Sequence, residues 1–305
     1  MNLGRVFLEN LLPVMVLAGL GFILRRRLNV DPRPLSQIVF YLFLPALVFQ
    51  LLVENSFTIP EMLQMAGFVC LLLTALAALA WVAARLLRLD RSMTSALILC
   101  ITFMNAGNLG LPITQLAFGP ETLAWASIFY ATMALLSNSA GVWIASVGRA
   151  SPSKALAGLA RVPAVYAIPL ALLLHAANVS LPPLVSVPVG LLARAAVPSM
   201  LLLLGMQLTG NGRREHVPAL SVAAVARLVV SPVLAWGLMA LFRFPAQAVQ
   251  AGILEAAMPT AVVNSILAAQ YDAEPEFVST AILASTLLSP LTLTPLLVLL
   301  SGTPA

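Results

Sequence analysis

Apolar residues are grouped along the chain in long blocks separated by short polar stretches. A helix that spans a bilayer needs about 20 consecutive, mostly apolar residues, and ten blocks reach or approach that length. Their approximate bounds are 5–24, 34–53, 61–87, 92–118, 121–147, 162–178, 185–209, 217–242, 245–270 and 276–300. The pattern therefore predicts an all-α integral membrane protein with ten transmembrane helices and no room for a soluble domain.

The composition agrees with a membrane location. Of the 305 residues, 61% are hydrophobic and only 9% are charged, whereas soluble domains carry about 25% charged residues. Too few polar side chains remain to cover a particle in water, so most of the exterior must face lipid. The net charge of +5 does not indicate a nucleic-acid partner, because the basic residues are concentrated in the short loops.

The distribution of basic residues predicts the orientation of the chain. Arg5 and Arg243 fall on one predicted side of the membrane, and the other side carries twelve basic residues. These twelve are Arg25, Arg26, Arg27, Arg33, Arg85, Arg88, Arg91, Arg149, Lys154, Arg161, Arg213 and Arg214. Loops rich in Lys and Arg stay in the cytoplasm, so we expect both termini outside and the central linker inside.

The two halves of the chain resemble each other at an offset of 155 residues. Leu79-Ala80-Trp81 aligns with Leu234-Ala235-Trp236, and Glu121 aligns with Glu276. The boundaries predicted from this repeat are a first five-helix repeat at 1–148, a cytoplasmic linker at 149–161 and a second repeat at 162–305. Five spans per repeat require opposite insertion, and inverted repeats are typical of secondary transporters. The alternative is a chance alignment of helices rich in Leu and Ala.

Two of the predicted spans contain helix-breaking and polar residues near their middles. Proline removes a backbone donor and clashes with the preceding turn, and broken helices at corresponding positions mark the binding site of a transporter. Half-helix N-termini near Pro112 and Pro259 would favour an anion, and the free carbonyls of the preceding half-helices would favour a cation. The alternative is two proline kinks whose asparagines bind neighbouring helices. The predicted substrate-binding residues are Asn105, Gly107, Asn108, Gly110, Pro112, Pro259, Thr260, Asn264 and Arg227.

Three ionisable residues fall inside predicted spans, where a charge costs roughly 2.5–3.5 kcal/mol on insertion scales. Glu255 precedes Pro259 by one turn and is a candidate carrier of Na⁺ or a proton. Arg227 would attract an anionic substrate or form an ion pair with Glu255. Arg194 would face a water-filled cavity or a dimer interface. For Glu255, the alternatives are a cap on local backbone and an ion pair with an arginine.

The motif Asn105-Ala-Gly-Asn-Leu-Gly-Leu-Pro112, together with Met258-Pro259-Thr260 and Asn264, resembles the auxin efflux carrier family over the whole chain. The resemblance implies that helices 4 and 9 cross at Pro112 and Pro259. It also implies a scaffold domain from about 5–53 and 162–209, through which the chain forms a homodimer. The transport domain would comprise about 61–147 and 217–300 and would move like an elevator.

The short linker is similar to that of bacterial members, which implies the cytoplasmic membrane of a bacterium. The fold is similar to that of the bile-acid sodium symporters, whose sodium-site segment Glu255-x-x-Met258 resembles. We therefore expect Glu255 and Met258 at a coupling-ion site, with no cofactor and no metal other than Na⁺ at Glu255.

These features predict a secondary transporter of small organic anions. Carboxylates are the expected substrates, including dicarboxylates such as malonate or malate and auxin-like acids. An intramembrane enzyme is one alternative, but the sequence lacks HExxH, GxSxG and a pair of intramembrane aspartates, so we do not expect an enzyme. A channel is the other alternative, although matched broken helices favour alternating access.

Overall fold

The computed structural model describes residues 3–55, 57–146, 163–176, 181–208 and 216–302, and within them the regular structure is helical apart from one isolated β-bridge. Seven of its helices are long and apolar enough to cross a membrane. These seven are Leu3–Leu28, Pro32–Glu54, Ile59–Leu86, Ala106–Ala145, Pro183–Gln207, Val217–Met239 and Pro275–Ser301. The predicted linker at 149–161 lies outside the described residues.

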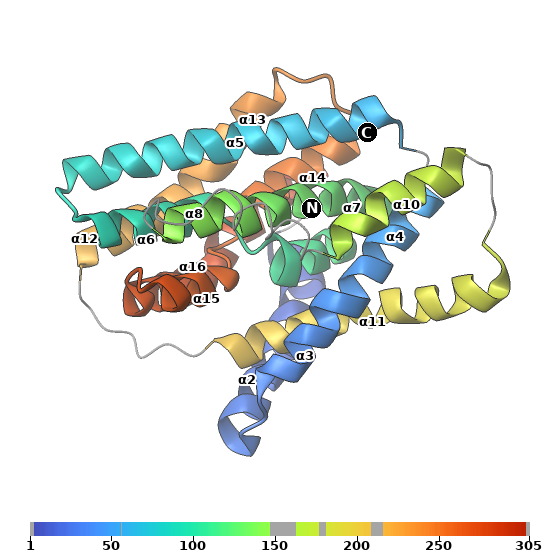
Figure 1. The fold of residues 1–305 in the computed structure, drawn as a ribbon, viewed down its shortest axis with the longest axis horizontal. Coiled ribbons are helices and arrows are strands. Elements are labelled where there is room, and N and C mark those ends of the chain that lie inside the picture. Colours follow the sequence, from blue (N-terminus) through green and yellow to red (C-terminus); the bar gives the residue numbers. More distant parts are fainter. Residues whose placement is uncertain (1–2, 56, 147–162, 177–180, 209–215, 303–305) are drawn as a thin grey trace.

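The N-terminal half corresponds to the first five predicted spans (Figure 1). Its elements are α1 (Leu3–Val6), η1 (Phe7–Leu11), α2 (Leu12–Leu28), α3 (Pro32–Ile38), η2 (Val39–Phe43), α4 (Leu44–Glu54), α5 (Ile59–Leu86), α6 (Arg91–Thr102), η3 (Ala106–Gly110), α7 (Leu111–Leu136), η4 (Ser137–Gly141) and α8 (Val142–Ala145). The predicted spans 92–118 and 121–147 meet at Gly119 (φ 79°), where the backbone of α7 leaves helical geometry, so α7 holds the end of the first span and most of the second. The first span is also interrupted after Thr102.

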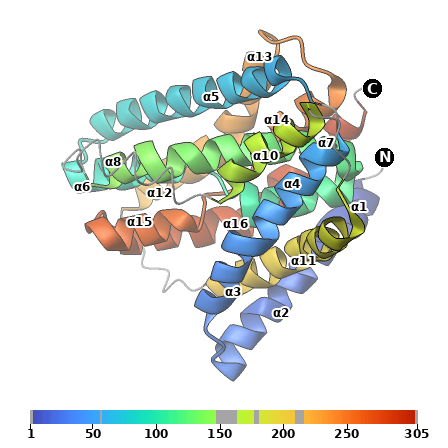
Figure 2. The same cartoon turned by 45° about the vertical axis from the view of Figure 1, so that its right-hand side comes forward.

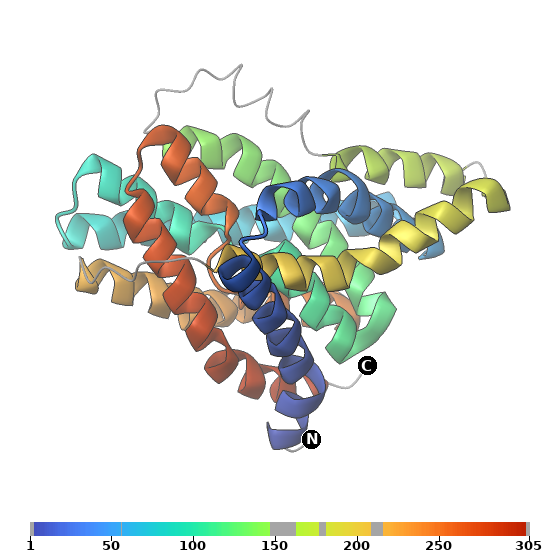
Figure 3. The same cartoon turned by 90° about the horizontal axis from the view of Figure 1, so that it is seen from below.

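The C-terminal half contains α10 (Ala164–Ala176), α11 (Pro183–Gln207), α12 (Val217–Val225), η5 (Ala226–Val230), α13 (Ser231–Met239), α14 (Ala246–Ala256), α15 (Val263–Tyr271) and α16 (Pro275–Ser301). The predicted span 245–270 is interrupted between α14 and α15, and α10 has 13 residues. These interruptions, and the run Ala106–Ala145 that continues across the break at Gly119, explain why seven rather than ten such spans are found among the described residues. α1 packs against α16, so the first and last described residues lie at the same end of the molecule (Figure 3).

Acidic and hydroxyl side chains begin three of the helices. The carboxylate of Asp31 accepts from the backbone N–H of Arg33, and that of Asp90 accepts from Met93. Thr58 forms a reciprocal capping box with Glu61 at the start of α5. These contacts satisfy amide groups that have no partner within the helix, and they fix where α3, α5 and α6 enter the apolar layer.

Prolines account for most of the π-helical segments. Four of the five π segments in the described chain end two residues before a proline, namely Pro13, Pro45, Pro112 and Pro232. A proline ring clashes with the carbonyl four residues earlier and gives it no hydrogen bond. The wider π turn relieves this clash, so the helices continue through these prolines without a break.

The helices are arranged in two groups (Figures 1 and 2). In one group α11 packs on α2 and α4, and α10 packs on α4; in the other α5, α6, α7, α13 and α14 pack on one another. α2 and α11 approach to backbone contact, because a Cβ atom at Gly21 would overlap the carbonyl of Leu202, and one at Gly205 would overlap that of Ala18. Small residues permit such close packing in membranes.

Candidate functional site

Two interrupted helices meet at the centre of the molecule. The break after α6 covers 103–105, the break after α14 covers 257–262, and the two strands of chain pair at Met104 and Thr260. The backbone N–H of Asn105 donates to the carbonyl of Pro259 at 2.7 Å, and the N–H of Ala261 donates to that of Phe103 at 3.0 Å. Non-helical backbone is tolerated at membrane depth only where protein or a wet cavity satisfies it, and here each break satisfies the other.

The first break does not lie where the sequence placed it. Pro112 was predicted at the crossing, but it lies inside α7, and the break is centred on Met104. At the repeat offset of 155, Pro259 corresponds to Met104 (259 − 155 = 104) rather than to Pro112. The π segment η3 accommodates Pro112 within the helix, so the second half-helix begins at Ala106.

The carbonyl groups at the end of α6 are not free, contrary to our expectation. The side-chain amide of Asn264 donates to the carbonyls of Leu99 (3.0 Å) and Phe103 (3.1 Å). The hydroxyl of Thr260 donates to the carbonyl of Cys100 at 3.0 Å. Thr260 lies in the second break and Asn264 in the first turn of α15 that follows it, and together they cap the end of the first broken helix, where the last carbonyls have no partner in the helix.

Arg227 completes this cap from η5. Its guanidinium donates to the carbonyls of Ile101 and Ala256, the latter at 2.5 Å, and to the hydroxyl of Ser231. The residue is 0% exposed. The predicted ion pair with Glu255 does not form, and in the described part of the chain no carboxylate lies within 4.0 Å of this guanidinium.

Glu255 is buried where α14 meets the start of α7. Its Oε1 accepts from the hydroxyl of Thr114 at 3.3 Å, and its Oε2 has no hydrogen-bond partner among the described residues. The carboxylate lies so close to Gly110 that an added Cβ atom there would overlap it. A fully buried carboxyl group with one unpartnered oxygen is costly in a low-dielectric interior, so the arrangement suits a group that takes up a cation or a proton.

The predicted asparagines differ in what their side chains contact. The Nδ2 of Asn105 and the Oδ1 of Asn264 are buried without a partner among the described residues. Because the Nδ2 of Asn264 is fixed by two carbonyls, its Oδ1 must face the other way. Asn108 instead donates to Gln207 of α11 at 3.3 Å, and Gly107 lies against Tyr130, whose ring would be 2.9 Å from an added Cβ atom.

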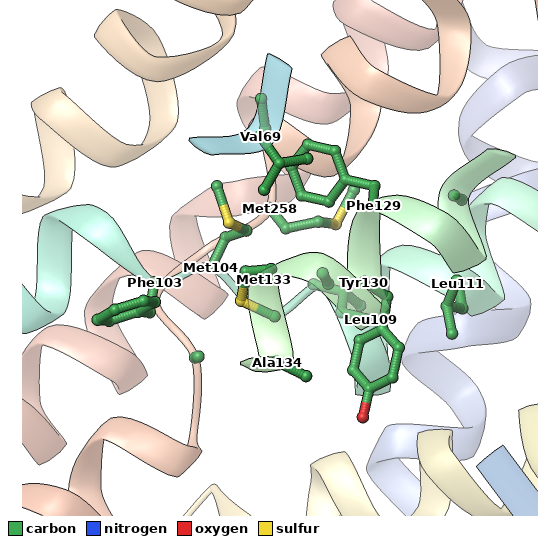
Figure 4. Packing of buried hydrophobic residues seen from close by; sticks show 14 of the residues in the cluster. Val69, Phe103, Met104, Leu109, Leu111, Phe129, Tyr130, Met133, Ala134 and Met258 are labelled. Atoms are coloured by element: carbon green, nitrogen blue, oxygen red, sulfur yellow. The ribbon is translucent and has the colours of Figure 1, made fainter. Parts of the chain in front are cut away.

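Met258 lies in the apolar core beside the crossing. Figure 4 shows its side chain among those of Val69, Met104 and Phe129, and it is 0% exposed. Its backbone N–H donates to the carbonyl of Glu255 at 3.2 Å. Met258 thus follows Glu255 by three residues, and its thioether packs against hydrophobic groups.

A cavity of about 1350 Å³ lies between α2 and α11 on one side and η3, α7 and α16 on the other, and no residue of either break lines it. Leu109 and Ile113 of the broken helix line it, together with hydroxyl groups of α16 that include Thr286. Arg25 and Arg26 from the end of α2 also line it. Glu276 at the start of α16 lines it too, so the cavity combines apolar walls and hydroxyl groups with charges of both signs.

Several contributing residues were missed by sequence reasoning. Ser231 follows Arg227 by one helical turn, a spacing that would have indicated the contact. Thr114 in the first half of the chain contacts Glu255 in the second, and Gln207 in the second half contacts Asn108 in the first. Ser285 of α16 accepts from the backbone N–H of Thr260 at 3.2 Å. No local pattern distinguishes these residues from other hydroxyl and amide groups in spans.

The fold and the crossing define a polytopic helical membrane protein with two paired broken helices, an arrangement that belongs to membrane transporters. The sequence matches the family described as membrane transport protein over residues 6–152 and 147–297. The chain belongs to this family, which is the auxin efflux carrier family indicated by its motifs.

Two archaeal proteins are similar along most of their length. An uncharacterized transporter of Methanothermobacter thermautotrophicus is 30% identical over 287 residues, covering 92% of this chain and 94% of the relative. An uncharacterized transporter of Methanocaldococcus jannaschii is 26% identical over 267 residues, covering 84% and 85%. The protein is thus a multi-pass membrane transport protein.

Proposed function

We propose that the protein is a secondary transporter that carries small organic anions, carboxylates in particular, through the crossing of the two broken helices. The observation that carries this proposal is the backbone pairing of Met104 with Thr260, beside which the Nδ2 of Asn105 is buried without a partner in the described chain. An amide donor next to a half-helix N-terminus suits a carboxylate. Malonate, malate and auxin-like acids are the substrates to test first.

The transport domain comprises about 61–147 and 217–300, and the scaffold comprises about 5–53 and 162–209. The two packing groups support this division, since α2, α4, α10 and α11 fall in one and the broken helices in the other. The close contact at Gly21 and Gly205 suits a rigid scaffold. The proposed chain crosses a bacterial cytoplasmic membrane ten times, in two inverted repeats, with both termini outside. Two copies form a homodimer through the scaffold.

Movement of the transport domain against the scaffold exposes the site to each side in turn. The cavity supports this mechanism, because its walls come from both groups of helices. Asn108 and Gln207 form a polar contact across the same boundary, which must break and reform in each cycle. Arg25 and Arg26 would raise the local concentration of anions at the cavity edge.

Glu255 couples this movement to Na⁺ or H⁺. Its carboxylate touches Gly110 at the end of η3 and Thr114 in α7, so a change of its charge acts directly on the half-helix that follows Asn105. In this proposal Arg227 supports the site as a fixed positive charge, since its guanidinium is already engaged by backbone carbonyls.

The thermal stability of the purified protein, measured against a panel of mono-, di- and aromatic carboxylates, tests the proposal. A ligand at 100 times its dissociation constant stabilises the native state by about 2.7 kcal/mol. We expect a carboxylate-specific shift that disappears in Asn105→Ala. A panel without any shift would count against an anionic substrate. Flux at rates far above those of a carrier would indicate a channel, and turnover of a bound compound would indicate an enzyme.

A further inference from the structure

The carboxyl-terminal ends of α6 and α14 converge on one point in the core, and Arg227 fills that point. Its guanidinium donates to Ile101 and Ala256, the second at 2.5 Å, and lies 3.5 Å from the carbonyl of Thr102. Ser231 accepts from the guanidinium and itself donates to Ala256 at 2.7 Å. One cation therefore joins the ends of two broken helices that are far apart in the sequence.

The backbone, rather than an acidic side chain, balances the charge of this arginine. Each helix C-terminus carries roughly half an elementary negative charge, so two converging ends supply about one. In the described chain no carboxylate lies within 4.0 Å of the guanidinium. The convergence of two such ends is the kind of position at which broken-helix transporters coordinate a cation.

We propose that Arg227 is a resident cation that occupies, between α6 and α14, the position of a coupling ion. It acts as a positioning residue, because it fixes the two half-helix ends around which the crossing is built. The position is closed to Na⁺ while the guanidinium is present, and Glu255 is left as the site of coupling. The assignment of coupling to Glu255 rests on the proposed transport function, whereas the occupancy of this position by Arg227 does not.

Thermal stability in different salts tests the occupancy without any substrate. Glu255→Gln serves as the parent, because it removes the other buried charge of the crossing. Melting temperatures of the parent and of Glu255→Gln/Arg227→Ala are compared in choline chloride, NaCl and millimolar guanidinium chloride. A second pair, with Arg194→Ala in the same parent, controls for loss of an arginine from a membrane helix, since Arg194 is exposed.

We expect the melting temperature of the parent and of the Arg194 variant to be the same in all three salts. That of the Arg227 variant should rise in NaCl or guanidinium relative to choline, because the vacated position retains its negative potential. Na⁺ stabilisation of the parent, or no response of the Arg227 variant to either cation, would overturn the proposal.

Transport by two full-length variants provides a second readout if the alanine variant does not fold. Arg227→Lys keeps a positive charge at this position, and Arg227→Met keeps an unbranched side chain but removes the charge. A resident cation predicts that Lys retains part of the uptake and Met loses it, whereas a packing role predicts the reverse and would refute the proposal. Failure of the unmodified protein to transport any carboxylate would count against the proposed function and leave the salt experiment valid.

Discussion

Gly110 offers a sharp test of the packing at the crossing. Its backbone has φ −63° and ψ −56°, so alanine would fit the helix without strain. The steric conflict is with the carboxylate of Glu255, which a Cβ atom at Gly110 would overlap. Overpacking of a core typically costs 1–3 kcal/mol, so Gly110→Ala should lower the free energy of unfolding by about that amount.

The sign of the effect should reverse when the carboxylate is removed. In a Glu255→Ala background the added methyl group has space, and alanine is better than glycine in a helix by roughly 0.5–1 kcal/mol. The assay is a double-mutant cycle of melting temperatures for the purified variants. Gly67→Ala is the matched control, because a Cβ atom at Gly67 in α5 meets nothing within 4 Å. Equal destabilisation by Gly110→Ala in both backgrounds would refute the described contact.

Three further predictions concern the other contacts. Asn264→Asp removes the donor to two carbonyls and should destabilise the protein by about 1–3 kcal/mol for each unsatisfied group; a melting temperature equal to the unmodified protein would contradict this. Gly205→Val should separate α2 from α11 and lower the melting temperature, whereas Gly19→Val, with open space at its Cβ position, should not. Gln207→Leu should change the rate of uptake but not the ligand-induced shift in melting temperature, and loss of that shift would place Gln207 at the binding site instead.

The sequence was most informative about the helices. Long apolar blocks gave the membrane class, and Asp31, Thr58 and Asp90 begin helices as capping chemistry predicts. The break at Pro259 was also predictable, because this proline has polar neighbours in the middle of a span. Proline alone did not locate the first break, since η3 keeps Pro112 within a helix.

The contacts across the crossing were beyond sequence reasoning. The carbonyls of α6 appeared available for a cation, yet side chains from 160 or more residues further along the chain occupy two of them. Arg227 was expected to form an ion pair with Glu255, and it instead donates to the hydroxyl of Ser231 and to two backbone carbonyls, which carry no sequence signal. The cavity likewise depends on how α2, α11 and α16 pack.

Uptake of labelled carboxylates by the purified protein in proteoliposomes tests most directly the central claim that the crossing carries the substrate. Asn105→Ala is compared with Asn138→Ala, because the side chain of Asn138 donates to the carbonyl of Ala134 one turn earlier, which lies outside both breaks. The account predicts saturable uptake that Asn105→Ala abolishes and Asn138→Ala preserves. Equal uptake by both variants and the unmodified protein would show that the substrate passes elsewhere.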